Sequence, residues 1–271
     1  MTYQPNPGTF EPVDPVRPLA PWQGGKRILA KRICAIISTI PHQLYAEAFV
    51  GMGGIFFRRA ERPRFEAIND WSDDVHNLFR IVQVHYLPFI EMIRHQLTFR
   101  SEFERMMKVD PSTLTDMQRA ARFLYLQKTT FGGKVRGQNF GVSPMNQARF
   151  DVTKLVPMID DVHARLSPVT IEHLPWADFI RKYDREGALF YLDPPYFGCE
   201  GDYGPGMFKR EEFAEMAELL RGMRGRFILS INDHPEVREL FDGFAMEAAD
   251  VRYTIGGNDK AKAFGELIIT N

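Results

Sequence analysis

The stretch LYAEAFVGMGGIFFRRAERPRFEAIND, residues 44–70, decides the fold. It begins with a strand-forming segment, LYAEAFV, and continues through the glycine turn GMGG into a short helix near residues 55–60. It ends in a second strand, RFEAIND, whose last residue is Asp70. A strand, a glycine turn, a helix and a strand that ends in an acid are the opening of a doubly wound α/β sheet. The segment therefore predicts an α/β protein with such a sheet.

The same alternation continues on both sides of this stretch. Helices are expected at about 27–40, 73–85, 210–222 and 235–241, where apolar residues recur at helical spacing. Further strands are expected in PVTIEHL, GALFYLD, RFILSIN, FAMEAADVRYTI and GELIITN, which all follow residue 166. Residues 87–166 are expected to be mainly helical, with a hairpin or ordered loop at 131–144 (FGGKVRGQNFGVSP). This predicts a sheet domain from residues 21–86 and 167–271, with 87–166 inserted in it.

Length and composition bound the class of protein. A chain of 271 residues with a net charge of −1 suits one large globular domain with an insertion. The five prolines among residues 1–20 predict an extended, poorly ordered arm. No apolar run approaches the roughly 20 residues that span a bilayer, and no leader sequence opens the chain, so we expect a cytoplasmic protein without a membrane partner. Two cysteines and seven histidines without HExxH spacing predict no metal site.

The glycine turn indicates a ligand. Gly51, Gly53 and Gly54 allow the backbone to approach a ligand closely, and Asp70 at the end of the next strand could accept hydrogen bonds from both ribose hydroxyls. A purely structural turn remains the alternative. If a cofactor binds there, it contains a nucleoside, and both NAD and S-adenosylmethionine fit that description.

The segment LFYLDPPYFG, residues 189–198, discriminates between the two cofactors. The exocyclic amine of adenine is a poor nucleophile because its lone pair is delocalised, and two acceptors aimed at its hydrogens would restore its pyramidal character. Asp193 can supply one acceptor and the carbonyl of Pro194 the other, while Pro194 and Pro195 fix the backbone. Tyr196 offers a flat face on which a base can stack. The alternative is an ordinary type I turn that closes a strand.

Taken with these two segments, four further motifs give a resemblance to a known family. They are PWQGGK at 21–26, NDWSDDVHNLFRIVQ at 69–83, LPWADFI at 174–180 and the closing GGNDKAKAFGELIITN. In this order the six motifs resemble the Dam-type DNA adenine methylases over most of residues 21–271. The resemblance implies a mixed Rossmann-like sheet of the S-adenosylmethionine-dependent methyltransferase type, with a target-recognition insertion before the catalytic motif.

The resemblance also implies an activity and a set of site residues. The activity is transfer of a methyl group from S-adenosylmethionine to the N6 amine of adenine in double-stranded DNA, at a short specific site, with base flipping. Met52 departs from the small residue that is common in the glycine turn. The alternatives are a core aromatic for Trp22, a solvated charge for Lys26 and a core residue on a helix face for Phe179. The implied cofactor-binding residues are Trp22, Lys26, Phe49, Gly51, Gly53, Gly54, Asp70, Asp178, Phe179 and Asp193.

DNA binding has independent support in the charge pattern. No acidic residue lies between Asp116 and Asp151, although six basic residues do, with aromatic residues among them. Such a local asymmetry suits phosphates, and the loop residues could reach base edges. A solvated helix face would explain Arg119 and Arg122 equally well. The expected DNA-binding residues are Arg119, Arg122, Lys128, Lys134, Arg136 and Asn139.

Two features near the catalytic motif have open interpretations. Residues 197–208, with four glycines and a proline, are either a mobile lid or a long surface loop. Asn232 and Asp233 either line the edge of the pocket or cap the helix that starts near Pro235.

Competing functions share parts of this pattern. A cytosine-N4 or RNA methyltransferase would use the same amine chemistry, and a non-catalytic DNA-binding protein could have kept the scaffold. A nicotinamide-dependent oxidoreductase would use the same glycine turn. The expected partner is double-stranded DNA, and a cognate restriction endonuclease is a possible further one. The chain is expected to be a monomer, with a dimer as the alternative.

Overall fold

The computed structural model of the protein describes residues 10–141, 145, 147–204, 206–252 and 263–271. Its main sheet has seven described strands in the order β5-β4-β2-β6-β7-β9-β8. The first five in this order run parallel, and β9 is antiparallel to both of its neighbours. The predicted mixed, doubly wound sheet is thereby confirmed. Its strands are β2 (Leu44–Glu47), β4 (Phe65–Asn69), β5 (Thr170–Glu172), β6 (Ala188–Leu192), β7 (Arg226–Asn232), β8 (Ala245–Arg252) and β9 (Ala263–Thr270).

The chain changes its direction of winding between β2 and β6. From β2 it moves outward through β4 to β5, and it then returns to the other side of β2 to form β6 and β7. Such a switch point leaves a crevice at the carboxyl ends of the two central strands. Glu47 is in register with Tyr191, so the residues that follow β2 and β6 meet at that edge.

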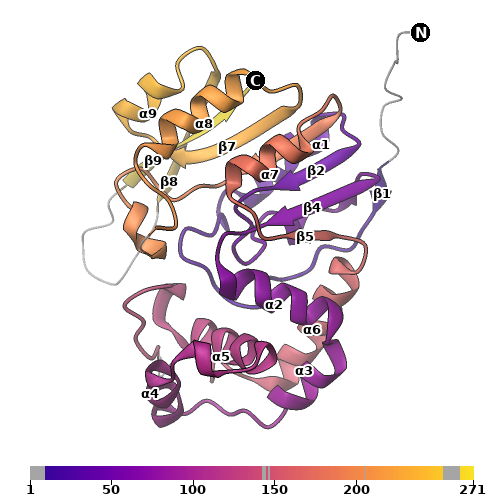
Figure 1. Ribbon diagram of the computed structural model, residues 1–271, viewed down its shortest axis with the longest axis vertical. Helices are drawn as coiled ribbons and strands as arrows, with labels where there is room; N and C mark the ends of the chain where they lie inside the picture. The colour runs from indigo at the N-terminus through magenta and orange to yellow at the C-terminus, as the bar shows by residue number, and fades with distance from the viewer. Residues whose placement is uncertain (1–9, 142–144, 146, 205, 253–262) are drawn as a thin grey trace.

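Helices cover both faces of the sheet because its central strands are apolar on both sides. On β6, Tyr191 faces the core that contains α1 (Ala30–Thr39) and α2 (Asp73–Val84). Phe190 faces the core that contains the three later helices. Figure 1 shows two of these later helices, α7 and α8, lying along the sheet. The later helices are α7 (Trp176–Tyr183), α8 (Glu212–Arg221) and α9 (Pro235–Leu240).

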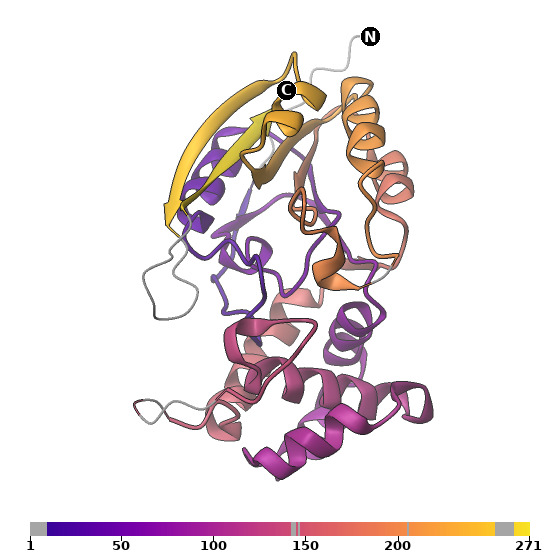
Figure 2. The same cartoon turned by 90° about the vertical axis from the view of Figure 1, so that its left-hand side faces the viewer.

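The predicted helical insertion lies at one end of the sheet, below it in Figures 1 and 2. Its buried side chains, such as Leu124 and Ile159, belong to the same core as Ile68 and Tyr191 of the sheet. The insertion and the sheet therefore share one apolar core. It contains α3 (Tyr86–Ile93), α4 (Arg100–Lys108), α5 (Asp116–Thr129) and α6 (Val152–Leu166), with single 3-10 turns η2 (Pro111–Thr113) and η3 (Phe131–Gly133).

A buried ion-pair cluster joins the insertion to the sheet. Arg165 at the end of α6 donates to both carboxylate oxygens of Glu66 on β4, at 2.6 and 2.8 Å. Arg59 lies 2.8 Å from the same carboxylate and stacks on the Tyr45 ring, 3.6 Å from its centroid. A bidentate pair of this kind fixes geometry, and loss of one partner would leave a charge buried without compensation.

The expectation of a poorly ordered arm is wrong for residues 10–20. The two-residue strand β1 (Glu11–Pro12) pairs antiparallel with β3 (Glu61–Arg62), and Leu19 is fully buried. The prolines favour extended backbone, which here pairs and packs instead of remaining free. Residues 1–9 lie outside the described part of the chain, as do residues 253–262 within the last motif. The helix expected near 55–60 is a single 3-10 turn, η1 (Phe56–Arg58).

Candidate active site

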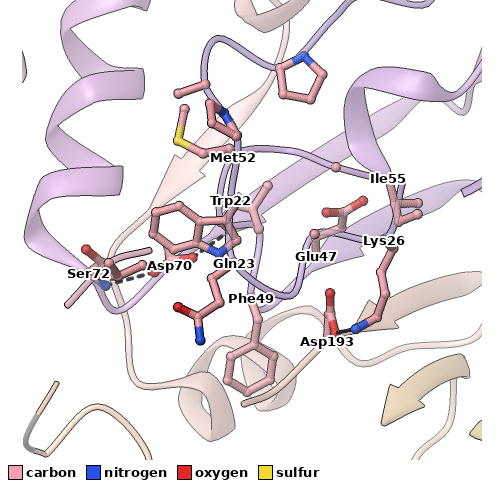
Figure 3. A pocket seen from close by; sticks show the side chains of 18 of the residues that line it. Trp22, Gln23, Lys26, Glu47, Phe49, Met52, Ile55, Asp70, Ser72 and Asp193 are labelled. Atoms are coloured by element: carbon pink, nitrogen blue, oxygen red, sulfur yellow. Dashed lines mark hydrogen bonds and ion pairs between the residues drawn. The ribbon is translucent and has the colours of Figure 1, made fainter. Parts of the chain in front are cut away.

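A cavity of about 740 Å³ opens at the carboxyl ends of β2, β4 and β6 (Figure 3). It lies at the switch point of the sheet, where doubly wound folds bind their ligands. Its wall combines aromatic rings with three carboxyl groups and two ammonium groups. The residues in its lining include Trp22, Lys26, Glu47, Phe49, Gly51, Met52, Gly54, Asp70, Trp71, Ser72, Lys128, Trp176, Tyr191, Asp193, Pro195 and Tyr203.

The glycine turn and Asp70 form one end of this cavity. The Gly51 amide donates to Asp70 Oδ2 at 2.8 Å, and the Ser72 amide donates to Oδ1 at 2.9 Å. Gly51 has φ +49°, and a Cβ atom there would lie 2.7 Å from Trp22 Nε1. Burial raises the pKa of Asp70 to about 6, although both amides favour the carboxylate. Gly51 is thus required by its close packing against Trp22, and an acid is fixed beside it in the cavity wall.

The other two glycines of the turn differ in role. Gly54 lines the cavity, but Gly53 does not. Gly53 has φ +73°, and a Cβ atom there would lie 2.3 Å from the Phe57 ring. A glycine is required at this position by packing against η1, so the expected contact between Gly53 and the cofactor is not supported.

Two tryptophans of the cavity wall were missed in the sequence. Trp71 follows Asp70 directly and stacks on His173, with ring centroids 5.1 Å apart and an interplanar angle of 15°. Its position next to the strand-terminal acid was the signal that could have found it. Trp176 lies 6.4 Å from Phe49 between ring centroids and donates to Glu212 at 2.9 Å. No spacing in the sequence marks Trp176 apart from other core aromatics.

Asp178 and Phe179, two of the expected cofactor-binding residues, do not line the cavity, so the structure does not support that role for them. Asp178 is exposed on α7 and pairs with Arg181 at 3.1 Å. Phe179 is fully buried and packs against Phe190 under the sheet. Successive residues of a helix point about 100° apart, and it is Trp176 that faces the cavity. The helix-face alternative for Phe179 is therefore the correct one.

Asp193 lies at the opposite end of the cavity. Its Oδ1 atom is 2.7 Å from Lys26 Nζ and accepts from Ser230 Oγ at 3.4 Å. Burial raises the pKa of Asp193 to about 6, and the Lys26 ammonium opposes that shift. Pro195 also lines the cavity, whereas Pro194 is buried and is not among the lining residues.

Tyr196 is half-buried beside the lining, next to Lys26 and Glu266. Its hydroxyl donates to Glu266 Oε2 at 2.9 Å and accepts from Lys26 Nζ at 3.1 Å. Lys26 is only 2% exposed, so the alternative of a solvated charge is wrong for it. Trp22 lines the cavity, although its ring also packs on Phe123 in the manner of a core aromatic.

Glu47 is a further acid that the sequence did not single out. It is 1% exposed at the end of β2 and accepts a hydrogen bond from the Tyr45 hydroxyl at 2.7 Å. Burial raises the pKa of Glu47 to about 8, so this carboxyl is mostly protonated at neutral pH. An acid inside a strand that is buried on both faces was the available signal.

The loop after the catalytic motif covers the cavity near Trp22. Its 3-10 turn, η4 (Glu200–Tyr203), brings the Tyr203 hydroxyl to the Gln23 carbonyl at 2.9 Å. The Gln23 side chain donates to Asp202 at 2.7 Å. This placement agrees with the lid interpretation of residues 197–208, of which Pro205 lies outside the described residues.

Asn232 and Asp233 do not line the cavity. Asn232 brackets the backbone of Phe197, accepting from its amide at 2.8 Å and donating to its carbonyl at 3.1 Å. Asp233 forms two hydrogen bonds with Arg238, each 2.7 Å long. His234, instead of either residue, caps α9. Both expectations for Asn232 and Asp233 are corrected, and Asn232 instead holds the catalytic turn in place.

The candidate DNA-binding residues fall into two groups. Lys134, Arg136 and Asn139 are exposed on a loop whose ends are joined by an antiparallel bridge between Thr130 and Phe140. Residues 142–144 of the expected hairpin lie outside the described residues.

The helix residues of that set make internal contacts instead. Arg122 donates to the Met106 carbonyl at 2.8 Å, and Lys128 donates to the Leu19 carbonyl at 3.1 Å. These bonds hold α5 against α4 and the N-terminal segment, so the structure gives both side chains a structural role and does not support the expected one in DNA binding. Arg119 pairs with Asp116 on its own helix at 3.3 Å, so its charge is compensated locally.

Hydrogen bonds fasten the loop to the turn that carries Trp22. The Gly133 carbonyl accepts from the Gln23 amide at 2.9 Å and from the Gln127 side chain at 2.7 Å. The buried Gln127 side chain also donates to the Pro21 carbonyl at 2.8 Å. The loop and the cavity are thus neighbours in space although about 110 residues separate them in sequence.

Neither a metal site nor a membrane span is found in the part of the chain that the structure describes. Within that part, no three His, Cys, Asp or Glu residues cluster as ligands for a metal ion. Its helices are all too short or too polar to cross a bilayer.

Comparison with protein families gives a match over most of the chain. Residues 22–255 match the model of the D12 class N6 adenine-specific DNA methyltransferases. The matched range begins at Trp22 and includes the glycine turn, Asp70 and the motif at 193–196.

Three curated proteins are similar to this chain along most of its length. The type II methyltransferase M1.LlaDCHI of Lactococcus lactis subsp. cremoris is 25% identical over 94% of this chain and 95% of that protein. The type II methyltransferase M.CviBI of Paramecium bursaria Chlorella virus NC1A is 23% identical over 88% of this chain and 91% of that protein. The DNA N-6-adenine-methyltransferase of Escherichia phage P1 is 25% identical over 88% of this chain but 33% of that protein.

Proposed function

This chain belongs to the family of D12 class N6 adenine-specific DNA methyltransferases, and we propose that its cavity holds S-adenosylmethionine and an adenine base side by side. The protein transfers a methyl group from S-adenosylmethionine to the N6 amine of adenine in DNA. Each end of the cavity would take one of these two reactants.

The Asp70 end of the cavity fits the nucleoside part of the cofactor. The Asp70 carboxylate, oriented by two backbone amides, would accept hydrogen bonds from the ribose hydroxyls. Trp71 presents a ring on which the adenine of the cofactor would stack. Gly51 leaves room where any side chain would collide with Trp22. When bound, S-adenosylmethionine supplies an electrophilic methyl group.

The Asp193 end fits the amine that receives the methyl group. Asp193 would accept a hydrogen bond from the N6 amine, and the Pro194 carbonyl would accept a second one. Both acceptors direct the nitrogen lone pair at the methyl group, and Tyr196 would stack on the target base. The Asp193 carboxylate would also stabilise the positive charge that develops on the amine during transfer.

One observation carries this assignment. The Asp193 carboxylate lines the same cavity as Asp70, so an acceptor for an amine and an acid for a ribose face one space of about 740 Å³. That volume lies within the range of small-molecule sites.

Replacement of Asp193 by alanine tests the assignment. We expect the Asp193→Ala variant to lose methyl transfer by at least about 100-fold, because the acceptor for the amine is gone. Labelled methyl incorporation into duplex DNA measures this, and calorimetry with S-adenosylhomocysteine serves as the control for an intact cavity. Turnover at the rate of the unaltered protein would defeat the assignment.

We further propose that the loop at 131–141 contacts double-stranded DNA at a short specific site while the target base is flipped into the cavity. Lys134 and Arg136 are exposed there, and the loop is hydrogen-bonded to the turn that carries Trp22. Asn139, also exposed, could reach base edges. A base inside a duplex cannot reach a pocket of this kind without extrusion. The loop at 197–208 would then close over it.

A salt series tests the loop. The double variant Lys134→Ala/Arg136→Ala should bind duplex DNA more weakly, and the slope of log Kd against log salt should fall by about two, because two phosphate contacts are lost. Arg105→Ala, which removes an exposed arginine on α4, is the matched control and should leave the slope unchanged. Equal slopes for the double variant and the control would contradict the proposal.

Three finer expectations follow from the resemblance and the DNA substrate. They are a cytoplasmic location, a monomeric protein and a cognate restriction endonuclease. Size-exclusion chromatography with light scattering tests the second.

A further inference from the structure

Glu266 contacts two members of the catalytic end at once. It lies on β9, in register with Asn232 of β7, and is 1% exposed. Its Oε1 atom is 3.1 Å from Lys26 Nζ, and its Oε2 atom accepts a hydrogen bond from the Tyr196 hydroxyl at 2.9 Å. Each carboxylate oxygen therefore holds a different group of the site.

Lys26 passes the influence of Glu266 on to Asp193. Its ammonium lies 2.7 Å from Asp193 Oδ1 and donates to the Tyr196 hydroxyl at 3.1 Å and to the Gly24 carbonyl at 3.3 Å. A buried ammonium is costly unless it is paired, and the two carboxylates offset that cost together. Glu266 thus fixes the place from which Lys26 reaches Asp193.

These contacts leave a specific atom of Asp193 for the amine. Lys26 and Ser230, the hydrogen-bonding partners of Asp193 among the described residues, both contact Oδ1. Oδ2 makes no such contact with a described residue, and we infer that it is the oxygen that receives the incoming amine. The plane of the Asp193 carboxylate depends on Lys26, which Glu266 holds in place. The tilt of the Tyr196 ring depends on Glu266 directly, through the ring hydroxyl.

We propose that Glu266 is a positioning residue for methyl transfer, which orients the Asp193 carboxylate through Lys26 and the Tyr196 ring through its hydroxyl. The inference rests on the proposed role of Asp193 as acceptor for the amine. By this inference β9, the last strand in the chain, helps to set the geometry of the catalytic end. The segment 193–196 would not fix that geometry by itself.

Charge distinguishes this role from a merely structural one. The charge of Glu266 raises the pKa of Asp193, and the charge of Lys26 lowers it. Asp193 is active only when it is ionised, so activity should decline at low pH, and this decline is the acid limb of the pH profile. Removal of the Glu266 charge and removal of the Lys26 charge should move the acid limb in opposite directions. The other groups that face Asp193 are Ser230, Glu47, Tyr191 and Tyr203, and both variants retain them.

The experiment compares Glu266→Gln with Lys26→Met in pH profiles of kcat/KM for duplex DNA, which report the enzyme before DNA binds. In Glu266→Gln the acid limb should move to lower pH, and in Lys26→Met to higher pH. On the plateau, kcat should fall by about 10²-fold in both, as expected when a reacting group is misplaced by about 1 Å. The affinity for S-adenosylhomocysteine and the unfolding midpoint of Glu266→Gln should remain close to those of the unaltered protein.

Two controls keep the inference open to refutation. Glu247→Gln removes an exposed carboxylate from the neighbouring strand β8 and should change neither the rate nor the limb. Glu266→Asp keeps the charge but is too short to hold both partners, so its limb should stay in place while kcat falls. If Glu266→Gln shows an unchanged kcat, or an unchanged limb, the inference is overturned.

Failure of the inference can be told apart from failure of the proposed function. An inactive Asp193→Ala beside a fully active Glu266→Gln would refute the role of Glu266 alone. An active Asp193→Ala would refute the role of Asp193 and, with it, that of Glu266.

Discussion

The two ends of the cavity hold a carboxylate in different ways. Asp70 is held by two backbone amides. One belongs to Gly51 in the glycine turn, and the other belongs to Ser72, two residues further along the chain. Asp193 is held by the side chains of Lys26 and Ser230, which come from distant segments. Burial raises the pKa of both acids to about 6, although different groups oppose the shift in each, backbone amides at Asp70 and the Lys26 ammonium at Asp193. Backbone amides survive any single substitution except one to proline, whereas side chains do not, so the catalytic end should be the more fragile of the two.

The largest expected effect contrasts the two acids themselves. Asp70→Ala should raise the Kd for S-adenosylhomocysteine by about 10-fold to 100-fold, because charge-assisted hydrogen bonds are lost and the two amides are left without their acceptor. Asp193→Ala should change that Kd by less than about three-fold. Calorimetry of both variants measures this. Equal losses of affinity would show that the two ends do not divide binding from chemistry.

The next effect concerns the glycine turn. Gly51→Ala should weaken S-adenosylhomocysteine binding by about 10-fold, because the new Cβ atom meets Trp22 and φ is +49°. Gly132→Ala is the matched control, since Gly132 has φ +71° but nothing within 4 Å of its added Cβ atom. The control should lose about 1 kcal/mol of stability and keep its affinity. Equal affinities of the two variants for S-adenosylhomocysteine would show that cofactor binding does not require a glycine at residue 51.

Trp71 sharpens the description of the Asp70 end. Trp71→Ala should weaken S-adenosylhomocysteine binding by about five-fold, which corresponds to a stacking contribution of about 1 kcal/mol. Trp71→Phe should recover most of the affinity, since a flat ring remains. A Trp71→Ala variant that binds as tightly as Trp71→Phe would exclude stacking on this ring.

The last effect is on stability instead of binding, and it concerns the acid between the two ends. The pKa of Glu47 is about 8 in the folded protein and 4.5 as its ordinary value, so the folded state holds a proton that the unfolded state has released between these pH values. Stability should therefore fall as the pH rises from 6 to 8, by up to about 1.4 kcal/mol per pH unit from this group. Glu47→Gln should remove that part of the slope in urea unfolding, and the exposed Glu247→Gln should not. Parallel slopes for Glu47→Gln and the unaltered protein would contradict a protonated Glu47.

The order of strands and helices could be predicted from the sequence because local signals agree with the fold. Apolar runs bounded by glycine, proline and acids marked the strands, and the predicted segment 226–232 coincides with β7. The Asp70 end was predictable for the same reason, since its turn and its acid belong to one short stretch. Trp71 could have been added from that stretch alone.

The catalytic end could be predicted only in part because it is assembled from distant segments. The sequence marks Asp193 and Tyr196, but nothing in it pairs Lys26 with Glu266 before β9 is placed beside β7. Asp178 was misplaced because the phase of α7 depends on how it packs under the sheet. Charge alone likewise could not distinguish the exposed Lys134 on the loop from Lys128, because the sequence does not show that Lys128 donates a hydrogen bond to the Leu19 carbonyl.

The bridge between Thr130 and Phe140 joins the two ends of the loop, so the shape of the loop depends less on the core than that of the surrounding helices does. Those helices share a core with the sheet and are anchored by the Arg165 and Glu66 pair, so exchanging them between relatives would disturb the whole molecule. The side chains at 134, 136 and 139 project from a segment whose two ends are already tied together. If the loop contacts DNA as proposed, a new target sequence could evolve, or be engineered, by substitutions at these three exposed positions, while Gly133 keeps its bond to the turn that carries Trp22.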